Sequence, residues 1–575
     1  MATEAHRLQL VPPGLLEPRL YRAAFAPALL AVVVLAFSLQ DQARSIASEL
    51  APPSFNAQRA ITIADQIVEN DGSRESGSLQ DDRTADLVQA RLSTFGFGAA
   101  RYRFDATTLN GKRTLTNVVG VRPGPSDRRL LILASRDGSD GKLERAGAYE
   151  TGVLLELARV LQGRAFEHTL VLASTTGGVD GGLGAAELAK SLRRPVDGIL
   201  VLRNVAAARE GAPVLTVFDS RLEPDPVFER TIEVLTAADI PGGSENRSIP
   251  AQLVRLAFPL GLGEQATFPS NGLTAAAVSP GGEPLAPPVD APFDPVNSIG
   301  QIALRMLTTF DGSFQPAAPQ TKPLAVAGKS IPQWALTLLI GTLLIPLLVA
   351  AIDGWARARR WRQSAVRGLL APPIAFVWLL LLGLLLRGIA LTGLIDAPSL
   401  PPNPLAFSAT APIVIGFVIA LLALVGVVVA AASARQGTPK GGESGFALWL
   451  AAAAVVVFVI NPIAAAFLVL PFHLLALLLL TGGASRRKVV AMTVVGLAPI
   501  AAAATYYPVV LGIPVLETVG YAVLLQAGGF VGLLALVGGC LAVAAGLSAF
   551  LHLLWTAPRP GTTNGLAAPL SPFRP

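Results

Sequence analysis

Long apolar runs near the two ends of the chain constrain its fold more than any other feature. One run, Ala23 to Leu39, and several more from Ile331 onward are long enough to cross a bilayer, which takes about 20 helical residues. Between them lie residues 40–330, whose composition is that of an ordinary soluble domain. With 52% hydrophobic and 15% charged residues, the whole chain is too apolar to be one soluble globule. The pattern predicts a multi-pass membrane protein with one large soluble domain.

Basic residues beside these runs predict the topology, because Lys and Arg stay on the cytoplasmic side of a membrane. Arg7, Arg19 and Arg22 precede the first span, so residues 40–330 are expected on the extracytoplasmic side. The alternation of basic and uncharged loops predicts eight spans, with nine as the alternative, and cytoplasmic termini. The bias toward Arg over Lys is typical of GC-rich bacterial genomes, so we expect the plasma membrane of a bacterium. Many of the basic residues behind the net charge of +6 lie in these loops, which favours membrane lipids and no nucleic acid as partners.

The predicted boundaries follow from these runs and loops. The segments are a cytoplasmic tail at 1–22, a first transmembrane helix at 23–39, an extracytoplasmic domain at 40–311, a Pro/Ala linker at 312–330, a bundle of about seven helices at 331–556 and a cytoplasmic tail at 557–575. One span is predicted at 411–432, and Asn461–Pro462 is expected to separate two helices. The run from Val515 to Trp555 fits one span preceded by a re-entrant or interfacial piece, or else two spans. Ser45–Ala47 fits a signal-peptidase site, but we expect the first span to be retained.

The soluble segment alternates helical and strand patterns. The runs LTNVVGV, RLLILAS, HTLVLAST and DGILVLRNV are short, and several are apolar on both faces. Strands of that kind lie inside a sheet that helices cover on both sides. The stretches TGVLLELARVLQ and GGLGAAELAKSL have helical spacing and supply crossover helices. The pattern predicts an α/β sandwich, followed by an all-α transmembrane bundle.

A series of short motifs runs in order through the soluble segment, roughly from Phe55 to Thr309. They are SRESGS, STFGF, TNVVGVRPG, RLLILASRDGS, GAYETGVLLELARVL, HTLVLASTTGGVDGGLGA, GILVLRNVA and GEQATFPSNGLTAAAV. In this order they resemble the di-zinc aminopeptidase family (peptidase family M-28), and within it a membrane-embedded branch that includes an endoplasmic-reticulum metallopeptidase and a subunit of the GPI transamidase. The resemblance implies a three-layer sandwich with a mixed, mostly parallel sheet.

The resemblance also implies where a zinc pair would be bound, and most of those positions carry other residues. The places of the first His, the bridging Asp, the Glu-Glu pair, the later Asp and the final His hold Ser135, Tyr149 or Glu150, Gly178–Val179, Arg203 and Gln265, respectively. A zinc pair needs His and carboxylate ligands and a Glu as general base. Asp137 alone matches, at a position whose family role is to orient the missing His. His168 is the one His between residues 40 and 330, and the single cysteine, Cys540, lies in an apolar run.

We therefore predict a pseudopeptidase without catalytic residues, metal or cofactor. Its expected role is to bind or hold a peptide, a lipid-linked substrate or a membrane-protein partner beside the bundle. The vestigial cleft is predicted to comprise Ser135, Arg136, Asp137, Tyr149, Glu150, Gly178, Val179, Asp180, Arg203 and Gln265.

Three alternatives stay open from the sequence. A divergent metallohydrolase would use carboxylates such as Asp137, Glu150 and Asp180, which suit Mg²⁺ or Ca²⁺ better than zinc. A transporter would use the outer domain as an accessory lid, although no Asp or Glu is found at mid-span. Finally, Arg136 and Arg203 would make the cleft attract anions if both faced it, whereas the simpler interpretation is that they are solvated or ion-paired.

Overall fold

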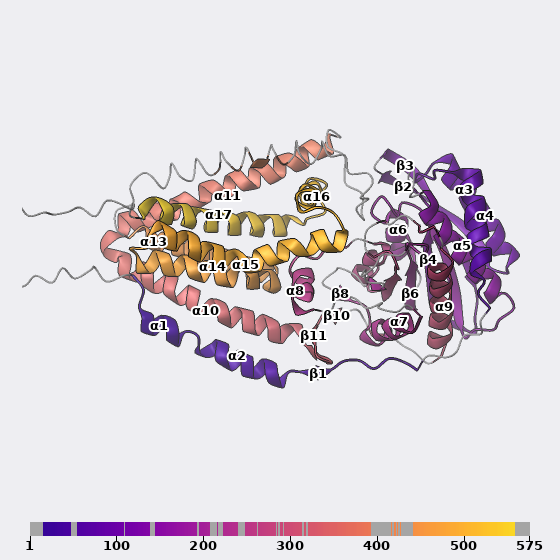
Figure 1. Cartoon of the computed structure of the whole chain (residues 1–575), viewed down its shortest axis with the longest axis horizontal. Coiled ribbons are helices and arrows are strands. Elements are labelled where there is room, and N and C mark those ends of the chain that lie inside the picture. Colours follow the sequence, from indigo (N-terminus) through magenta and orange to yellow (C-terminus); the bar gives the residue numbers. More distant parts are fainter. Residues whose placement is uncertain are drawn as a thin grey trace, which may run out of the picture.

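Two parts are distinct in the computed structural model, a sheet domain between Ala57 and Phe310 and a helical bundle that begins at Gln333 (Figure 1). Two N-terminal helices, α1 (Pro18–Ala23) and α2 (Ala26–Phe37), lie along the bundle beside its first helix. The structure describes residues 15–47, 54–108, 110–138, 144–192, 195–207, 215–216, 222–239, 248–261, 263–282, 285, 288–290, 292–312, 316–317, 320–392, 416, 419–420, 423, 426 and 441–557.

A seven-stranded sheet forms the centre of the sheet domain. Its strands are β2 (Gly98–Thr108), β3 (Gly111–Arg122), β4 (Ser126–Ser135), β5 (His168–Thr175), β6 (Val196–Leu202), β7 (Leu215–Thr216) and β9 (Ala275–Val278). Their spatial order is β2-β3-β5-β4-β6-β9-β7. The central strands β5, β4, β6 and β9 are parallel, whereas β2, β3 and β7 pair antiparallel at the edges. The predicted α/β fold with a mixed sheet is therefore confirmed.

Helices cover both faces of this sheet, which makes three layers. They are α3 (Ala57–Asp71), α4 (Leu79–Thr94), α5 (Glu144–Leu161), α6 (Leu183–Ser191), α7 (Pro226–Asp239) and α9 (Phe293–Phe310), with the short helices η2 (Glu264–Thr267) and η3 (Pro269–Asn271). Alternate residues of β4 enter separate cores: Leu130 and Ile132 pack with α3, α5 and α9, whereas Leu131 and Leu133 pack with α6. This two-sided burial explains why the central strands are apolar on both faces.

The bundle contains seven helices among the described residues. They are α10 (Gln333–Arg357), α11 (Arg362–Leu391), α13 (Glu443–Ile460), α14 (Pro462–Thr481), α15 (Arg486–Leu511), α16 (Val515–Ala527) and α17 (Leu533–Thr556), and the 3₁₀ turn η4 (Ala358–Trp361) joins α10 to α11. Seven helical segments of the described chain are long and apolar enough to span a membrane. They are Pro18–Phe37, Gln333–Arg357, Gly368–Leu391, Glu443–Ile460, Pro462–Thr481, Arg486–Leu511 and Leu533–Thr556. These helices are those of a multi-pass membrane protein. The span predicted at 411–432 lies largely outside the described residues.

Two breaks in the bundle follow the sequence prediction. Asn461 ends α13 in an extended conformation, and its side chain caps α14 by accepting hydrogen bonds from the amides of Ile463 and Ala464. The run after Val515 divides into α16, which is too short to span, and the longer α17. α16 lies at the end of the bundle that faces the sheet domain (Figure 1).

A small sheet joins the two parts of the molecule. Its strands are β1 (Gln40–Asp41), β12 (Lys329–Ile331) and β11 (Leu324–Val326), and β1 pairs antiparallel with β12. A separate pair is formed by β8 (Leu222–Glu223) and β10 (Gln320–Thr321). The segment predicted as a linker, 312–330, thus contains strands and is more regular than its Pro/Ala composition indicates.

One helix of the outer region, α8 (Ile249–Ala257), docks on the bundle. The Asn461 side chain donates hydrogen bonds to the carbonyl oxygens of Leu256 and Ala257, at 3.0 and 2.9 Å, and so caps the C-terminus of α8. Tyr507 Oη donates to the carbonyl of Phe258, and Gln252 exchanges two hydrogen bonds with the backbone of Ala325 in β11. α8 therefore contacts both the bundle and the small joining sheet.

Candidate functional site

A small pocket of about 30 Å³ lies where the carboxyl ends of the parallel strands meet. In open α/β sheets this end is the usual place for ligands. The lining residues come from the ends of β4 and β6, the N-terminal part of α5, the turn after β5, and η2. They are Ser135, Asp137, Gly138, Ala146, Gly147, Glu150, Gly178, Val179, Arg203, Glu264 and Leu285.

Asp137 is held by three hydrogen-bond donors. Its Oδ1 accepts from Ser135 Oγ at 2.5 Å and from the Gly178 amide at 3.0 Å. Its Oδ2 accepts from the Val179 amide at 3.1 Å. Ser76 Oγ lies 3.4 Å from the same oxygen, but its single proton is donated to Asp180 Oδ2 at 2.5 Å. The protein therefore fills three of the about four acceptor positions of this carboxylate.

Gly178 is required by the close approach of its neighbours. A Cβ at this position would overlap Ser135 Oγ and would lie 3.3 Å from Asp137 Oδ1. The turn from Gly177 to Gly182 therefore brings backbone amides, and no side chain, against Asp137. The position that the family resemblance assigns to a Glu has no room for one.

Two further carboxylates, Glu150 and Glu264, are buried in the pocket wall. Glu150 Oε1 accepts a hydrogen bond from the Asn204 amide at 2.7 Å, and Glu264 Oε1 accepts one from Thr175 Oγ1 at 2.9 Å. Burial, and then the negative charge of Glu264, raise the pKa of Glu150 well above its usual value. Burial and the charge of Asp137 raise the pKa of Glu264 to about 7.

Arg203 supplies the positive charge among these carboxylates. Its side chain is 7% exposed and lowers the pKa of both Glu150 and Glu264, against the larger effect of burial. Asn204 follows it with φ of 47°, a left-handed conformation that Asn tolerates better than most residues. The Asn204 side chain fixes this turn by donating to Ser279 Oγ and to the carbonyl of Gly282. The guanidinium is thus directed into the acidic pocket by a tightly bonded turn.

The pocket lies close to the bundle. Burial raises the pKa of the Tyr521 phenol in α16, and the charge of Arg203 acts on the same group in the opposite direction. Tyr521 packs with Leu511, Ile513 and Leu525, and Leu260 of the loop before η2 packs against this cluster. Arg203 of the pocket is therefore close enough to the end of the bundle to act electrostatically on Tyr521.

The structure brings six of the ten residues predicted for the cleft together and leaves the other four out of the pocket lining. Those in the lining are Ser135, Asp137, Glu150, Gly178, Val179 and Arg203. Arg136 is fully buried beside the pocket, where Nε lies 2.8 Å from Asp81 Oδ1. The hypothesis that Arg136 and Arg203 jointly attract an anion is therefore wrong, because Arg136 is neutralised by its own partner.

The other three predicted residues lie outside the pocket lining. Tyr149 Oη donates to Asp65 Oδ1 of α3 at 3.2 Å. Asp180 Oδ2 accepts from Ser76 Oγ at 2.5 Å. Gln265 is buried behind the lining, where a Cβ on Gly263 would overlap both Gln265 Oε1 and Arg203 Nη1.

The sequence interpretation missed Glu264. It immediately precedes Gln265 in the segment GEQATFPSNG and is the only carboxylate there. When the family's site positions are matched to this sequence one by one, the position falls on Gln265. In the structure, the 3₁₀ conformation of η2 turns the neighbouring Glu264 into the pocket. The isolated carboxylate in an uncharged segment was the available signal.

Some features of the pocket do not fit a zinc pair. None of the described residues that line it is His or Cys, and no group of three or more His, Cys, Asp and Glu in the described chain is placed to hold a metal ion. Three protein donors hold Asp137, and the Arg203 guanidinium would repel a cation beside Glu150 and Glu264. The residues that line the pocket are therefore not the set of His and carboxylate ligands that a zinc pair needs.

His168 lies at the opposite end of the same strands and is no part of this pocket. Its Nε2 is 2.8 Å from Asp197 Oδ2, and its Nδ1 is 3.2 Å from Asp311 Oδ1. Arg128 pairs with the other oxygen of Asp197. This cluster joins the starts of β5 and β6 to the end of α9, so its role is structural.

Comparisons with solved structures find proteins similar to about half of the chain. A glutaminyl cyclase from Porphyromonas gingivalis is 16% identical, with a TM-score of 0.33, and the match covers 45% of this chain and 99% of that protein. A zinc aminopeptidase from Bacillus subtilis is 12% identical, with a TM-score of 0.37 and coverage of 45% and 95%. A leucine aminopeptidase precursor from Bacteroides thetaiotaomicron is 13% identical, with a TM-score of 0.31 and coverage of 45% and 99%. No protein-family model and no curated protein matches the chain.

Proposed function

We propose that this protein is a membrane-anchored pseudopeptidase, in which a peptidase-like domain binds or scaffolds and does not catalyse. The observation that carries the proposal is the position of Arg203 among Asp137, Glu150 and Glu264. In a catalytic metal site these carboxylates would face a dication, whereas here a guanidinium of the same chain lines the pocket with them. The amides of Gly178 and Val179 donate hydrogen bonds to the carboxylate of Asp137, which is the one residue that matches the family pattern.

The proposed role is to hold a peptide, a lipid-linked substrate or a membrane-protein partner beside the bundle. Its support is the short distance between the pocket and the bundle, since Tyr521 of α16 lies within electrostatic range of Arg203. We place the domain outside the cytoplasm and both termini inside, in the plasma membrane, because of the basic loops between the apolar runs. The resemblance to the membrane-embedded aminopeptidase branch belongs to the same proposal.

The test uses the full chain, purified in detergent and analysed for bound metal by elemental mass spectrometry. Aminopeptidase and glutaminyl cyclase activities are then assayed with and without added zinc, because solved structures similar to the domain carry both names. We expect metal far below one equivalent and no turnover above the level of a mock preparation. Stoichiometric zinc together with turnover that a chelator abolishes would overturn the proposal.

A further inference from the structure

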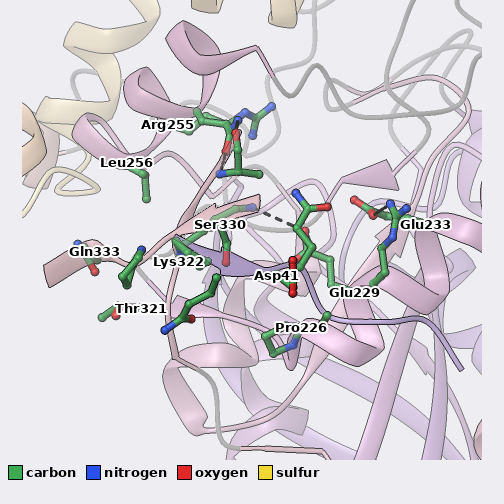
Figure 2. Close-up of a pocket in the computed structure, with 18 of the residues that line it drawn as sticks. Asp41, Pro226, Glu229, Glu233, Arg255, Leu256, Thr321, Lys322, Ser330 and Gln333 are labelled. Atoms are coloured by element: carbon green, nitrogen blue, oxygen red, sulfur yellow. Dashed lines mark hydrogen bonds and ion pairs between the residues drawn. The ribbon is translucent and has the colours of Figure 1, made fainter. Parts of the chain in front are cut away.

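A second cavity, of about 540 Å³, lies where the sheet domain meets the bundle (Figure 2). Its walls come from residues 40–43 after α2, from α7, from α8, from the segment between β10 and β12, and from the start of α10. Two chain segments connect the membrane helices to the sheet domain, one after α2 and one before α10. Both segments line the cavity, because β1 pairs with β12. The volume lies within the range of about 300–1,000 Å³ that is typical of small-molecule sites.

Exposed apolar side chains adjoin this cavity on the two helices that end at it. Phe37, the last residue of α2, is 88% exposed, and it precedes the lining residue Gln40 by only three positions. Trp334, in the first turn of α10, is 57% exposed and lines the cavity, and Leu338 one turn further is 41% exposed. Trp is favoured at the level of lipid headgroups, with apolar side chains below it. From these side chains we expect the cavity at headgroup level, on the side of the membrane that faces the domain.

The cavity presents charges of both signs. Its acidic set is Asp41 with Glu229 and Glu233 of α7, and its basic set is Arg230 of α7, Arg255 of α8 and Lys322 after β10. Figure 2 shows Asp41, Glu229, Glu233, Arg255 and Lys322 around the cavity. The two sets lie close together and partly pair, since Lys322 Nζ is 3.9 Å from Glu229 Oε1 and Arg230 Nη1 is 3.0 Å from Glu233 Oε2. A simple anion or cation would be attracted by one set and repelled by the other. A ligand that carries both charges a few ångströms apart satisfies both sets.

We propose that this cavity binds the zwitterionic headgroup of a phospholipid from the membrane leaflet that faces the domain. The phosphate lies beside Arg255 and Lys322, and the ammonium group lies beside Glu229 and Glu233. The acyl chains follow the exposed faces of α2 and α10. The ammonium group is a primary one, as in phosphatidylethanolamine, because carboxylates accept hydrogen bonds that a quaternary ammonium group cannot donate. Quaternary groups are bound by aromatic cages, and Trp334 is the only aromatic residue among those that line the cavity.

This proposal is independent of the proposed function, because the cavity shares no lining residue with the pocket around Arg203. The test reconstitutes the full chain in nanodiscs of equal phosphatidylethanolamine, phosphatidylcholine and phosphatidylglycerol, extracts it in detergent and measures the retained lipid by native mass spectrometry. We expect the wild type to retain phosphatidylethanolamine selectively. Lys322→Ala and Arg255→Ala should each lower its retention about tenfold, the loss expected for one charge-assisted hydrogen bond.

Matched controls separate loss of the site from loss of the fold. Lys190→Ala removes an exposed lysine that pairs with Glu187 on α6, far from the cavity, and should leave lipid retention unchanged. Thr321→Trp fills the cavity without changing any charge and should also abolish retention, while melting temperature reports whether each variant is folded.

Three results would overturn the proposal. The first is a wild type that retains no lipid or prefers phosphatidylglycerol. The second is retention that is equal in the wild type and in folded Lys322→Ala, Arg255→Ala and Thr321→Trp. The third comes from titration with soluble phosphoethanolamine, followed by ³¹P NMR: if it competes as well as the intact lipid at equal concentration, the ligand is a free phosphate ester and the membrane source is wrong.

Discussion

The space between Gly178 and Ser135 has room for only one side chain, and the Ser135 hydroxyl fills it. Because Ser135 Oγ fills the position of a Cβ on Gly178, the turn after β5 can offer only backbone amides to Asp137. These amides and the Ser135 hydroxyl hold the Asp137 carboxylate in place. The structural role of the turn is inferred from its hydrogen bonds to Asp137, which are shorter than 3.5 Å. It is not inferred from the absence of a catalytic residue.

Gly178→Ala is expected to lower the free energy of unfolding by about 1–3 kcal/mol, the usual cost of overpacking a tight site. Its new Cβ meets Ser135 Oγ, so the double variant with Ser135→Ala should recover part of the loss. Gly312→Ala is the matched control, since nothing lies within 4 Å of a Cβ there. The melting temperatures of the wild type and of these three variants are measured by thermal unfolding in detergent. Equal melting temperatures for Gly178→Ala and Gly312→Ala would contradict the steric argument.

Arg203→Ala is expected to turn the acidic pocket into a weak cation site. Without the guanidinium, Glu150 and Glu264 lose the charge that lowers their pKa values, and the domain should be destabilised by about 3–5 kcal/mol. Added Ca²⁺ or Mn²⁺, which prefer oxygen ligands, should then raise the melting temperature of the variant and not that of the wild type.

Arg128→Met is the control for Arg203→Ala, because it removes an arginine paired with Asp197 at the opposite end of the sheet. This variant should show no stabilisation by either cation. If both variants respond alike, the cation effect is unspecific and the assignment of Arg203 as the internal counter-ion is wrong.

At the scale of secondary-structure elements, the sheet domain is tied together by polar contacts at its edges. His168 at the start of β5 contacts Asp197 of β6 and Asp311 after α9, and all three are hidden from solvent or nearly so. Burial alone would lower the pKa of His168, but the hydrogen bonds to Asp197 and Asp311 raise it from its ordinary value of 6.5 to about 9. The folded state therefore favours the imidazolium form.

This shift gives a pH dependence of stability with a defined sign. A raised pKa in the folded state stabilises fully below the unfolded pKa of 6.5 and loses that contribution as the pH rises through 9. We expect the free energy of unfolding to fall by on the order of 3 kcal/mol across this window. Asp311→Asn should flatten the fall, because it removes one of the two carboxylates. Chemical denaturation at a series of pH values checks this, and an unchanged slope in Asp311→Asn would refute the assignment.

Asn461 couples two helices through one side chain. Its oxygen caps the N-terminus of α14, and its nitrogen caps the C-terminus of α8. Asn461→Ala should cost about 2 kcal/mol and should loosen α8 specifically, because two buried carbonyl oxygens lose their donor. Ser485→Ala removes the cap of α15 and touches no part of the sheet domain, which makes it the matched control. Hydrogen exchange in α8 should rise only in Asn461→Ala; similar exchange in both variants would argue against the coupling.

The sequence predicted the parallel centre of the sheet and the break at Asn461, because both depend on local patterns of apolar residues and on proline. It did not predict that Arg136 pairs with Asp81 or that Glu264 enters the pocket, because both depend on contacts between segments more than 50 positions apart. The docking of α8 was missed for the same reason, since its partners Asn461 and Tyr507 lie about 200 positions further on.

At the scale of the whole molecule, seven helical segments of the described chain are able to span a membrane, and the outer domain is inserted between the first and the second. The basic loops predict that α4 lies outside the cell and that the start of α15 lies in the cytoplasm. The orientation is open to a direct measurement because the chain has a single cysteine, Cys540.

Cysteines at two exposed positions test this orientation in a Cys540→Ala background. Thr94→Cys on α4 should react with a membrane-impermeant maleimide in intact cells, whereas Lys488→Cys on α15 should react only after permeabilisation. The opposite pattern would invert the topology, and reaction of both in intact cells would contradict the odd number of spans predicted between these two positions.

The pairing of β1 with β12 means that the outer domain is attached to the membrane helices by two chain segments that are hydrogen-bonded to each other. A single segment would let the domain rotate about one strand, whereas a paired one resists that rotation, and the docking of α8 on the bundle adds a further restraint. The cavity of about 540 Å³ is lined by both segments, through Asp41 and Ser330, and by α7 of the sheet domain. A molecule bound in that cavity would contact both segments and the domain at once, so we expect binding to restrict the motion of the domain relative to the bundle.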